Sequence, residues 1–127
     1  MARQNVSTGG PWEAKIGCSR AVRVGQSVQV SGTTAMTATG LVGKSDPYAH
    51  TIQALKTIEA ALVQAGASMA DVVRTRIYMA NIDQWQEVGR GHGEVFGSIR
   101  PATTMVEVKR LIDPDMLIEI EADAIVS

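Results

Sequence analysis

An alternation of apolar and acidic residues near the C-terminus is the strongest constraint on how this chain can fold. Successive side chains of an extended chain point to opposite sides, so residues 117–126 predict a β-strand with one buried face and one acidic face. Such a strand needs neighbours to cover its apolar side. The apolar positions are Ile118, Ile120, Ala122, Ala124 and Val126, and the acidic positions are Glu119, Glu121 and Asp123.

Period-two alternation also predicts the other strands. Residues 21–31 alternate on either side of Gly25 and Gln26, which is typical of a β-hairpin. Residues 72–80 are rich in β-branched and aromatic side chains and predict a strand. Residues 101–111 predict another long strand, joined to the last one by a turn around Pro114.

Two segments carry helical periodicity instead. Asp46 and Pro47 predict the start of a helix that ends at Gly66. Asp83 and Gln86 resemble a capping box in front of a second helix that reaches Ile99. Glycines at positions 89, 91, 93 and 97 destabilise this second helix. They indicate close packing on a sheet or, as the alternative, a kink that opens a ligand site.

The order hairpin, helix, strand, helix, strand, strand predicts the α+β class. In this class the two helices pack on one face of a mixed sheet. A chain of 127 residues has room for one such domain, covering residues 1–127.

Charge and composition exclude several function classes. With 12 Lys and Arg against 13 Asp and Glu, the chain lacks the basic excess that nucleic-acid binding needs, so we expect no nucleic-acid partner. No long apolar run and no secretory leader is visible, so we expect no membrane association. Cys18 is the only cysteine and is interpreted as a packing residue in a chain of the reducing cytoplasm.

The residues also give little support to bound metals or cofactors. His50 and His92 lie far apart in the sequence and have no partner at a metal-ligand spacing. The Gly89–Gly93 stretch lies within a helical period and lacks the lysine of a phosphate loop. We therefore expect neither a metal nor a cofactor.

Four short motifs together resemble the RidA/YjgF family. They are residues 101–111 followed by 118–122, the Gly10-Pro11-Trp12 entry, the strand end at Val30-Ser31-Gly32, and the helix-to-strand passage at 65–73. Their order and spacing also match, and the resemblance spans roughly residues 10 to 126. It implies a chorismate-mutase-like fold that assembles as a homotrimer with clefts between subunits. It further implies hydrolysis of reactive imines and enamines to ammonia and a keto acid.

Family roles can be transferred to individual positions. The resemblance places the glutamate that positions the attacking water at Glu119, the aromatic wall of the cleft at Trp12, and the strand-end pair at Ser31 and Gly32. For Trp12 the alternative is plain core packing. For Glu119 the alternative is a solvent-facing or interface carboxylate that shares its face with other acids.

The chain departs from the family at the position that binds the substrate carboxylate. Relatives have an arginine two residues after the signature proline, where this chain has Thr103, and many have a thiol where it has Met105. A threonine has no charge, so carboxylate binding should weaken. Arg90 is the first candidate to compensate, with a solvated helix face as the alternative. Other candidates are Arg20, Arg23, Arg74, Arg76 and Arg100.

Two functions therefore stay open. The first is a small-molecule hydrolase that acts on a C=N or similarly reactive bond, whose substrate need not carry the usual carboxylate. The second is a trimeric module that binds a metabolite or stabilises proteins without catalysis. A third function, RNA cleavage or binding, is disfavoured by the net charge of −1 and by the few aromatic residues.

Overall fold

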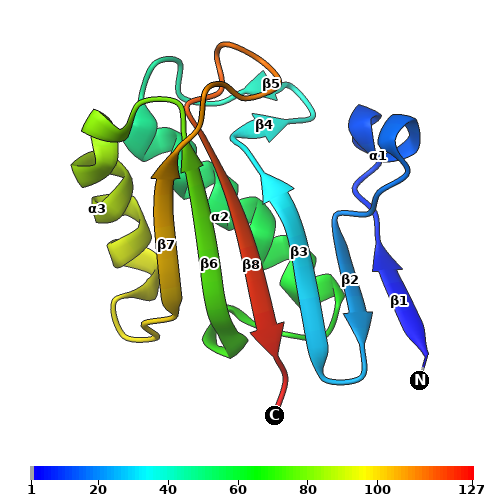
Figure 1. The fold of residues 1–127 in the computed structure, drawn as a ribbon. Helices are drawn as coiled ribbons and strands as arrows, with labels where there is room; N and C mark the ends of the chain where they lie inside the picture. Colours follow the sequence, from blue (N-terminus) through cyan, green and yellow to red (C-terminus); the bar gives the residue numbers. More distant parts are fainter. Residues whose placement is uncertain (1) are drawn as a thin grey trace.

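The computed structural model describes residues 2–127, which form a six-stranded mixed sheet in the order β1-β2-β3-β8-β6-β7 (Figure 1). Strands β6 and β7 are parallel and every other neighbouring pair is antiparallel. The predicted α+β class with a mixed sheet is confirmed. The strands are β1 Arg3–Val6, β2 Ala21–Val24, β3 Ser27–Thr33, β6 Val72–Met79, β7 Ala102–Glu107 and β8 Ile118–Ile125.

Two long helices, α2 (Pro47–Gln64) and α3 (Trp85–Phe96), lie on the same side of the sheet (Figure 1). The opposite side of the central strands is covered by no element of residues 2–127. The smaller elements are α1 Pro11–Ile16, the two-residue strands β4 Met36–Thr37 and β5 Gly40–Leu41, and the 3-10 turns Met69–Asp71 and Ile82–Gln84.

The predicted boundaries of α2 are confirmed. The side chain of Asp46 accepts a hydrogen bond from the backbone N–H of Ala49 at 3.1 Å and caps the helix start. Gly66 adopts a φ of +81° just after the helix, a conformation that glycine adopts without steric cost. The buried face of α2 contributes Leu55, Ile58 and Leu62 to the core.

The alternation in β8 is also confirmed. The four strand positions from Ile118 to Ala124 that face the helices are at most 1% exposed, and the acidic positions between them lie on the open face. Val126, just after the strand, packs partly against the same core. This arrangement makes β8 the strand that separates the packed core from an open polar surface.

Three predicted boundaries were wrong. Asn81, not Asp83, begins the turn before α3, because the Asn81 Oδ1 accepts from the Asp83 N–H at 3.0 Å. Helix α3 ends at Phe96, before Ile99. Strand β7 ends at Glu107, before Leu111, because its neighbour β6 ends at Met79 and offers no further partner. Strand β1 and helix α1 were not predicted from the sequence.

Of the α3 glycines, Gly91 has the close contact that the sequence predicts, but with a helix and not with the sheet. A Cβ at position 91 would lie 3.0 Å from Cγ2 of Thr51 on α2. A Cβ at Gly89 or Gly93 would meet no atom within 4 Å. Gly91 therefore lets the two helices approach each other.

Candidate functional site

Glu119 lies on β8 and points to the open face of the sheet, the side opposite the helices. Its register partner on β6 is Tyr78, whose side chain shares that face. The carboxylate is partly buried, and this desolvation raises its pKa, while the positive charge of Arg20 opposes the shift and Glu121 adds to it. Glu119 is therefore a carboxylate whose protonated form is favoured more than in water.

Gly32 provides the space that Glu119 occupies. The pairing of β3 with β8 shifts between Val30 and Thr33, which is a β-bulge. A Cβ at position 32 would lie 2.8 Å from the Cδ of Glu119 and closer still to Oε2. The carboxylate thus lies across strand β3 at the one residue of the bulge that has no side chain.

Arg20 approaches the same point from the other side of β3. It precedes β2, and its Nη2 donates a 3.0 Å hydrogen bond to the carbonyl oxygen of Gly32. Its Nε is buried and has no hydrogen-bond partner within residues 2–127. Because the strand order is β2-β3-β8, Arg20 and Glu119 flank Gly32 on neighbouring strands. From the sequence Arg20 was only one candidate arginine among several, and the alternation of residues 21–31 did not indicate its face, because Val22 and Val24 suggest the opposite one.

The hydroxyl of Ser31, on β3, is hydrogen-bonded to the backbone of the segment that precedes β2. It donates to the backbone oxygen of Ser19 at 2.7 Å, and the Ser31 N–H donates to the backbone oxygen of Arg20 at 3.0 Å. Both bonds hold the segment that carries Arg20 against the bulge. Ser31 therefore fixes the position of Arg20 and Gly32 rather than offering a free hydroxyl.

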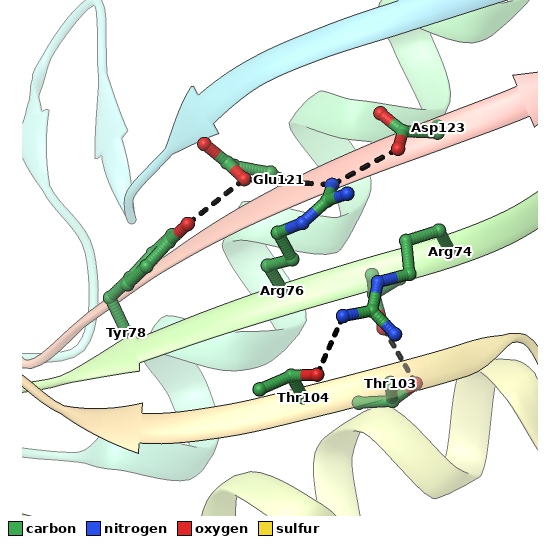
Figure 2. Close-up of polar contacts among 8 residues, drawn as sticks. Arg74, Arg76, Tyr78, Thr103, Thr104, Glu121 and Asp123 are labelled. Atoms are coloured by element: carbon green, nitrogen blue, oxygen red, sulfur yellow. Dashed lines mark hydrogen bonds and ion pairs between the residues drawn. The ribbon is translucent and has the colours of Figure 1, made fainter.

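Thr103 lies on the other face of the sheet from Glu119. Its register partner is Thr75, three residues before Tyr78 on β6, so the two sites point to opposite sides. The Thr103 and Thr75 hydroxyls lie 2.7 Å apart, and the Thr75 hydroxyl lies 2.9 Å from Nε2 of His92 (Figure 2 shows the pair of strands). Thr103 is thus the outer end of a hydrogen-bonded chain that leads inward to α3.

A shallow hollow of about 280 Å³ opens beside this chain, lined among others by His92, Arg100 and Thr103. Burial lowers the pKa of His92, so its neutral form is favoured. Met105 shares the Thr103 face and packs partly against the core. A larger hollow of about 430 Å³ lies along β1 and β2, and of the candidate residues from the sequence only Arg23 lines it.

The aromatic and ionic contacts of Trp12 and Arg90 are with residues other than Glu119 and Thr103. Trp12 lies on α1, is 43% exposed, and has the Lys15 ammonium 5.8 Å from its ring. Arg90 forms ion pairs with Glu87 at 2.9 Å and with Glu94 at 3.6 Å, and it does not line the hollow beside Thr103. Its guanidinium also stacks on the Tyr48 ring, 3.8 Å from the ring centre.

The arginines of β6 are engaged by side chains of the open face (Figure 2). Arg76 lies 3.0 Å from Asp123 and 3.8 Å from Glu121, and these carboxylates raise its pKa. Arg74 donates to the Thr104 hydroxyl at 2.7 Å. The open face therefore carries a polar network next to Glu119.

Residues 2–127 contain neither a cluster of metal-binding side chains nor a membrane-spanning helix. No group of three or more His, Cys, Asp or Glu side chains could hold a metal ion. No helix in that range is long and apolar enough to cross a membrane.

Comparison with known proteins places the chain among small proteins of one family. The family model described as Endoribonuclease L-PSP matches residues 12–126. An uncharacterised protein of Streptomyces coelicolor is 40% identical over 123 residues, which cover 97% of this chain and 92% of that protein. A RutC family protein of Pyrococcus abyssi is 36% identical over 107 residues, 84% of each chain.

Solved structures agree with this placement. A Mycobacterium tuberculosis protein described as a member of the highly conserved YjgF/YER057c/UK114 family superposes with a TM-score of 0.91 at 53% identity. The match covers 98% of this chain and all of that one. A Thermotoga maritima protein described as a putative endoribonuclease superposes with a TM-score of 0.83 at 31% identity, covering 97% and 92% of the two chains.

Proposed function

Because this chain belongs to the YjgF/RidA family, we propose that it is a small-molecule hydrolase that acts on a reactive C=N bond, with Glu119 as the residue that activates water. The observation that carries the proposal is the environment of Glu119. Its carboxylate is partly desolvated, lies in the space left by Gly32, and forms no ion pair within residues 2–127. A carboxylate in such a place can accept a proton from water.

The reaction needs only modest help, because an imine carbon is already electrophilic. Glu119 takes a proton from the water as the oxygen bonds to that carbon, and the C=N electron pair moves to nitrogen. Glu119 returns its proton to the nitrogen, and transfer of the hydroxyl proton to the nitrogen then lets the C–N bond break, so that ammonia leaves and the carbon keeps the oxygen as a carbonyl. Orientation of the water is the main contribution asked of the protein.

We propose a homotrimer with the reaction in clefts between copies. The open face of the sheet, which includes Glu119, is uncovered in the single chain, and Thr103 points to the opposite side. One chain therefore cannot bring these two residues to the same small molecule, whereas the edge of a second copy can. Trp12, Ser31, Gly32, Thr103 and Met105 would line such clefts. We expect residues 1–127 to act as one domain in the cytoplasm.

The experiment measures the decay of a 2-imino acid, released by an amino-acid oxidase, with and without the protein. We expect faster ammonia release with wild-type protein and loss of the acceleration in Glu119→Gln. Glu121→Gln is the matched control, because Glu121 lies on the same face of the same strand and accepts a hydrogen bond from Tyr78. Equal activity of Glu119→Gln and wild type would refute the assignment.

A second candidate is a metabolite-binding module without catalysis. The observation in its favour is that the hydroxyl of Thr103 is already hydrogen-bonded to Thr75 and to the backbone oxygen of Pro101. Thr103 therefore does not replace the arginine that binds the substrate carboxylate in relatives. A small molecule that raises the melting temperature without being converted would support this candidate, since a ligand that binds only the native state stabilises it.

Action on RNA is not part of the proposal, although the family model carries the description endoribonuclease. The net charge of −1 supplies little attraction for phosphates. We expect no RNA affinity at physiological salt in a filter-binding assay. An affinity that falls steeply with added salt would overturn this expectation.

A further inference from the structure

His50 is a fully buried ionisable side chain that the proposed reaction does not use. It belongs to the first turn of α2 and is 0% exposed, and no other ionisable residue among residues 2–127 is buried to this extent. A histidine changes its charge near neutral pH. The packing around a buried histidine therefore depends on pH.

The two ring nitrogens of His50 have different surroundings. Nδ1 accepts a hydrogen bond from the backbone N–H of Leu117 at 3.4 Å, so the proton of the neutral ring lies on Nε2. Nε2 is buried and has no hydrogen-bond partner within residues 2–127, which costs free energy in the folded chain. The ring is therefore held by one bond, in which it must be the acceptor.

That bond connects α2 to the start of β8. Leu117 is the last residue before β8, and its carbonyl oxygen accepts a hydrogen bond at 3.0 Å from the N–H of Ala80, the first residue after β6. The helix thus holds the N–H of Leu117, while the sheet holds its carbonyl. Because Glu119 follows two positions later on β8, His50 fixes the segment that leads into the candidate site.

A second segment packs against the same ring. Gly43 lies between β5 and α2, where a Cβ would be 3.5 Å from Cδ2 of His50 and 2.5 Å from Cβ of Ala49. Gly43 has a φ of +75°, which glycine adopts without steric cost. His50 therefore contacts both the segment that enters α2 and the segment that enters β8. We call Gly43, His50 and Leu117 the loop junction.

The surroundings of the loop junction compensate a positive ring only in part. Burial lowers the pKa of His50, while the backbone oxygen of Gly43 and the charge of Asp46 oppose the shift. The ring forms no ion pair within residues 2–127. Helix α3 approaches α2 through Gly91, which has no charge, and the strands beneath α2 present apolar side chains. The charged residues of the segments at the junction are Lys44, Asp46, Asp113 and Asp115. Among them, Asp46 is the one whose charge acts on the ring.

We propose that His50 is an acid-sensitive latch, which holds the loop junction closed while the ring is neutral and releases it when the ring takes up a proton. A proton added to Nδ1 turns the acceptor into a donor that faces the N–H of Leu117, so the bond is lost. The positive ring then gains free energy by moving into water. The segments before α2 and β8 come free, while the sheet stays paired. The latch does not depend on whether Glu119 activates water.

The direction of the pH effect follows from the pKa of His50. This pKa is lowered from 6.5 in the closed junction and returns to that value when the ring reaches water. The stability of the closed junction is fully present above pH 6.5 and is lost as pH falls toward the lowered pKa. Each pH unit within that window raises the ratio of open to closed junction by up to about tenfold.

Amide hydrogen exchange, followed by NMR on the full chain, tests the latch at one atom. We expect the protection factor of the Leu117 N–H to fall by about fivefold to tenfold from about pH 7.5 to about pH 5.5. The N–H of Ala122 lies on β8 between β3 and β6. Its protection should be at least about 100-fold higher at every pH, because the middle of the sheet opens only on unfolding.

His50→Asn removes the titration and keeps an acceptor, because the Asn side-chain oxygen lies near the place of Nδ1 and takes up no proton. Its Leu117 protection should change by less than about twofold over the same range. His92→Gln is the matched control, since burial also lowers the pKa of His92 but its Nε2 contacts Thr75. This variant should keep the wild-type pH dependence at Leu117.

Ring NMR of His50 in the wild type adds a measurement that needs no variant, and its pKa should lie below 6.5. A pKa of 6.5 or above would overturn the latch, as would a Leu117 protection that does not change with pH. The same holds if His50→Asn keeps the pH dependence or His92→Gln loses it. Equal protection of Leu117 and Ala122 would also refute the latch, because the junction would then open only when the whole chain unfolds.

Discussion

Gly32 and Glu119 share one space in this protein: the carboxylate of Glu119 lies where a side chain at position 32 would begin. The two residues come from adjacent strands, and the β-bulge at Gly32 brings them together. Position 32 therefore needs a glycine because a Cβ would collide with Glu119, and not because its backbone adopts a conformation that only glycine tolerates.

Gly32→Ala should consequently damage the site more than the fold. The new Cβ would displace the end of a flexible side chain, so the loss of stability should be small, while the displaced carboxylate should lower activity about 100-fold. Imine hydrolysis and thermal melting measure the two effects. Gly32→Ala combined with Glu119→Ala should lose no more activity than Glu119→Ala alone. Additive losses would show that Gly32 acts by another route.

The stability effect of Glu119→Gln should depend on pH. The pKa of Glu119 is raised in the folded chain, so the folded protein holds this proton more tightly than the unfolded one. The stability that protonated Glu119 provides is present below the ordinary pKa of 4.5 and is lost as pH rises through the raised value. Urea titrations should therefore show Glu119→Gln gaining on wild type from pH 4 to pH 7. A constant difference would contradict the raised pKa.

Thr75 should be a structural link between β7 and α3. Its hydroxyl is fully buried and meets both His92 and Thr103. Thr75→Val removes this link and leaves the partly buried imidazole of His92 without its partner, at a cost of about 1–3 kcal/mol in unfolding free energy. Thr104→Val, on the exposed face of β7, is the control and should cost less. Equal costs would show that burial of the hydroxyl is not decisive.

The glycines of α3 should respond differently to alanine. At Gly89 the added methyl meets open space, so Gly89→Ala should stabilise the protein by about 0.5–1 kcal/mol through helix propensity. At Gly91 the methyl would press on the buried Thr51, and overpacking of about 1–3 kcal/mol should exceed that gain. Denaturant unfolding of the two variants gives the comparison. A stabilised Gly91→Ala would mean that the two helices can move apart at little cost.

Glu13 should titrate far below its usual range. The hydroxyls of Ser7 and Thr8 each donate to its carboxylate at 2.6 Å and lower the pKa of Glu13 from 4.5 to about 2. The stability from these bonds is therefore present above pH 4.5 and is lost as pH falls toward 2. Carboxyl NMR should give the midpoint, and Ser7→Ala should raise it. A midpoint near 4.5 in wild type would mean that the bonds do not form in solution.

Regular local patterns made the elements around the core predictable. Alternation identified β8, and Asp46, Pro47 and Gly66 set the limits of α2, because both signals depend on residues near in sequence. Helix α1 was missed because it is short and buries none of its residues. The capping residue Asn81 was missed because a 3-10 turn precedes α3.

The candidate site depends on contacts that no local pattern contains. Arg20, Gly32 and Glu119 meet only because β3 pairs with both β2 and β8. Thr103 turns away from Glu119 because of its register with Thr75 on β6. The family resemblance identified Gly32 and Glu119 as site residues, but neither the resemblance nor the periodicity indicated that Arg20 joins them.

The extra residue in β3 has a consequence for comparing sequences. Val30 and Thr33 both face the helices although they are an odd number of positions apart, which in a regular strand would place them on opposite faces. The bulge inserts one extra residue between them and so restores the same face. An alignment that places a one-residue gap between them would assign the residue at the end of the strand to the wrong face. The number of residues between those two positions, rather than the identity of any one of them, would then tell whether a relative keeps the bulge against which the glutamate of the last strand lies.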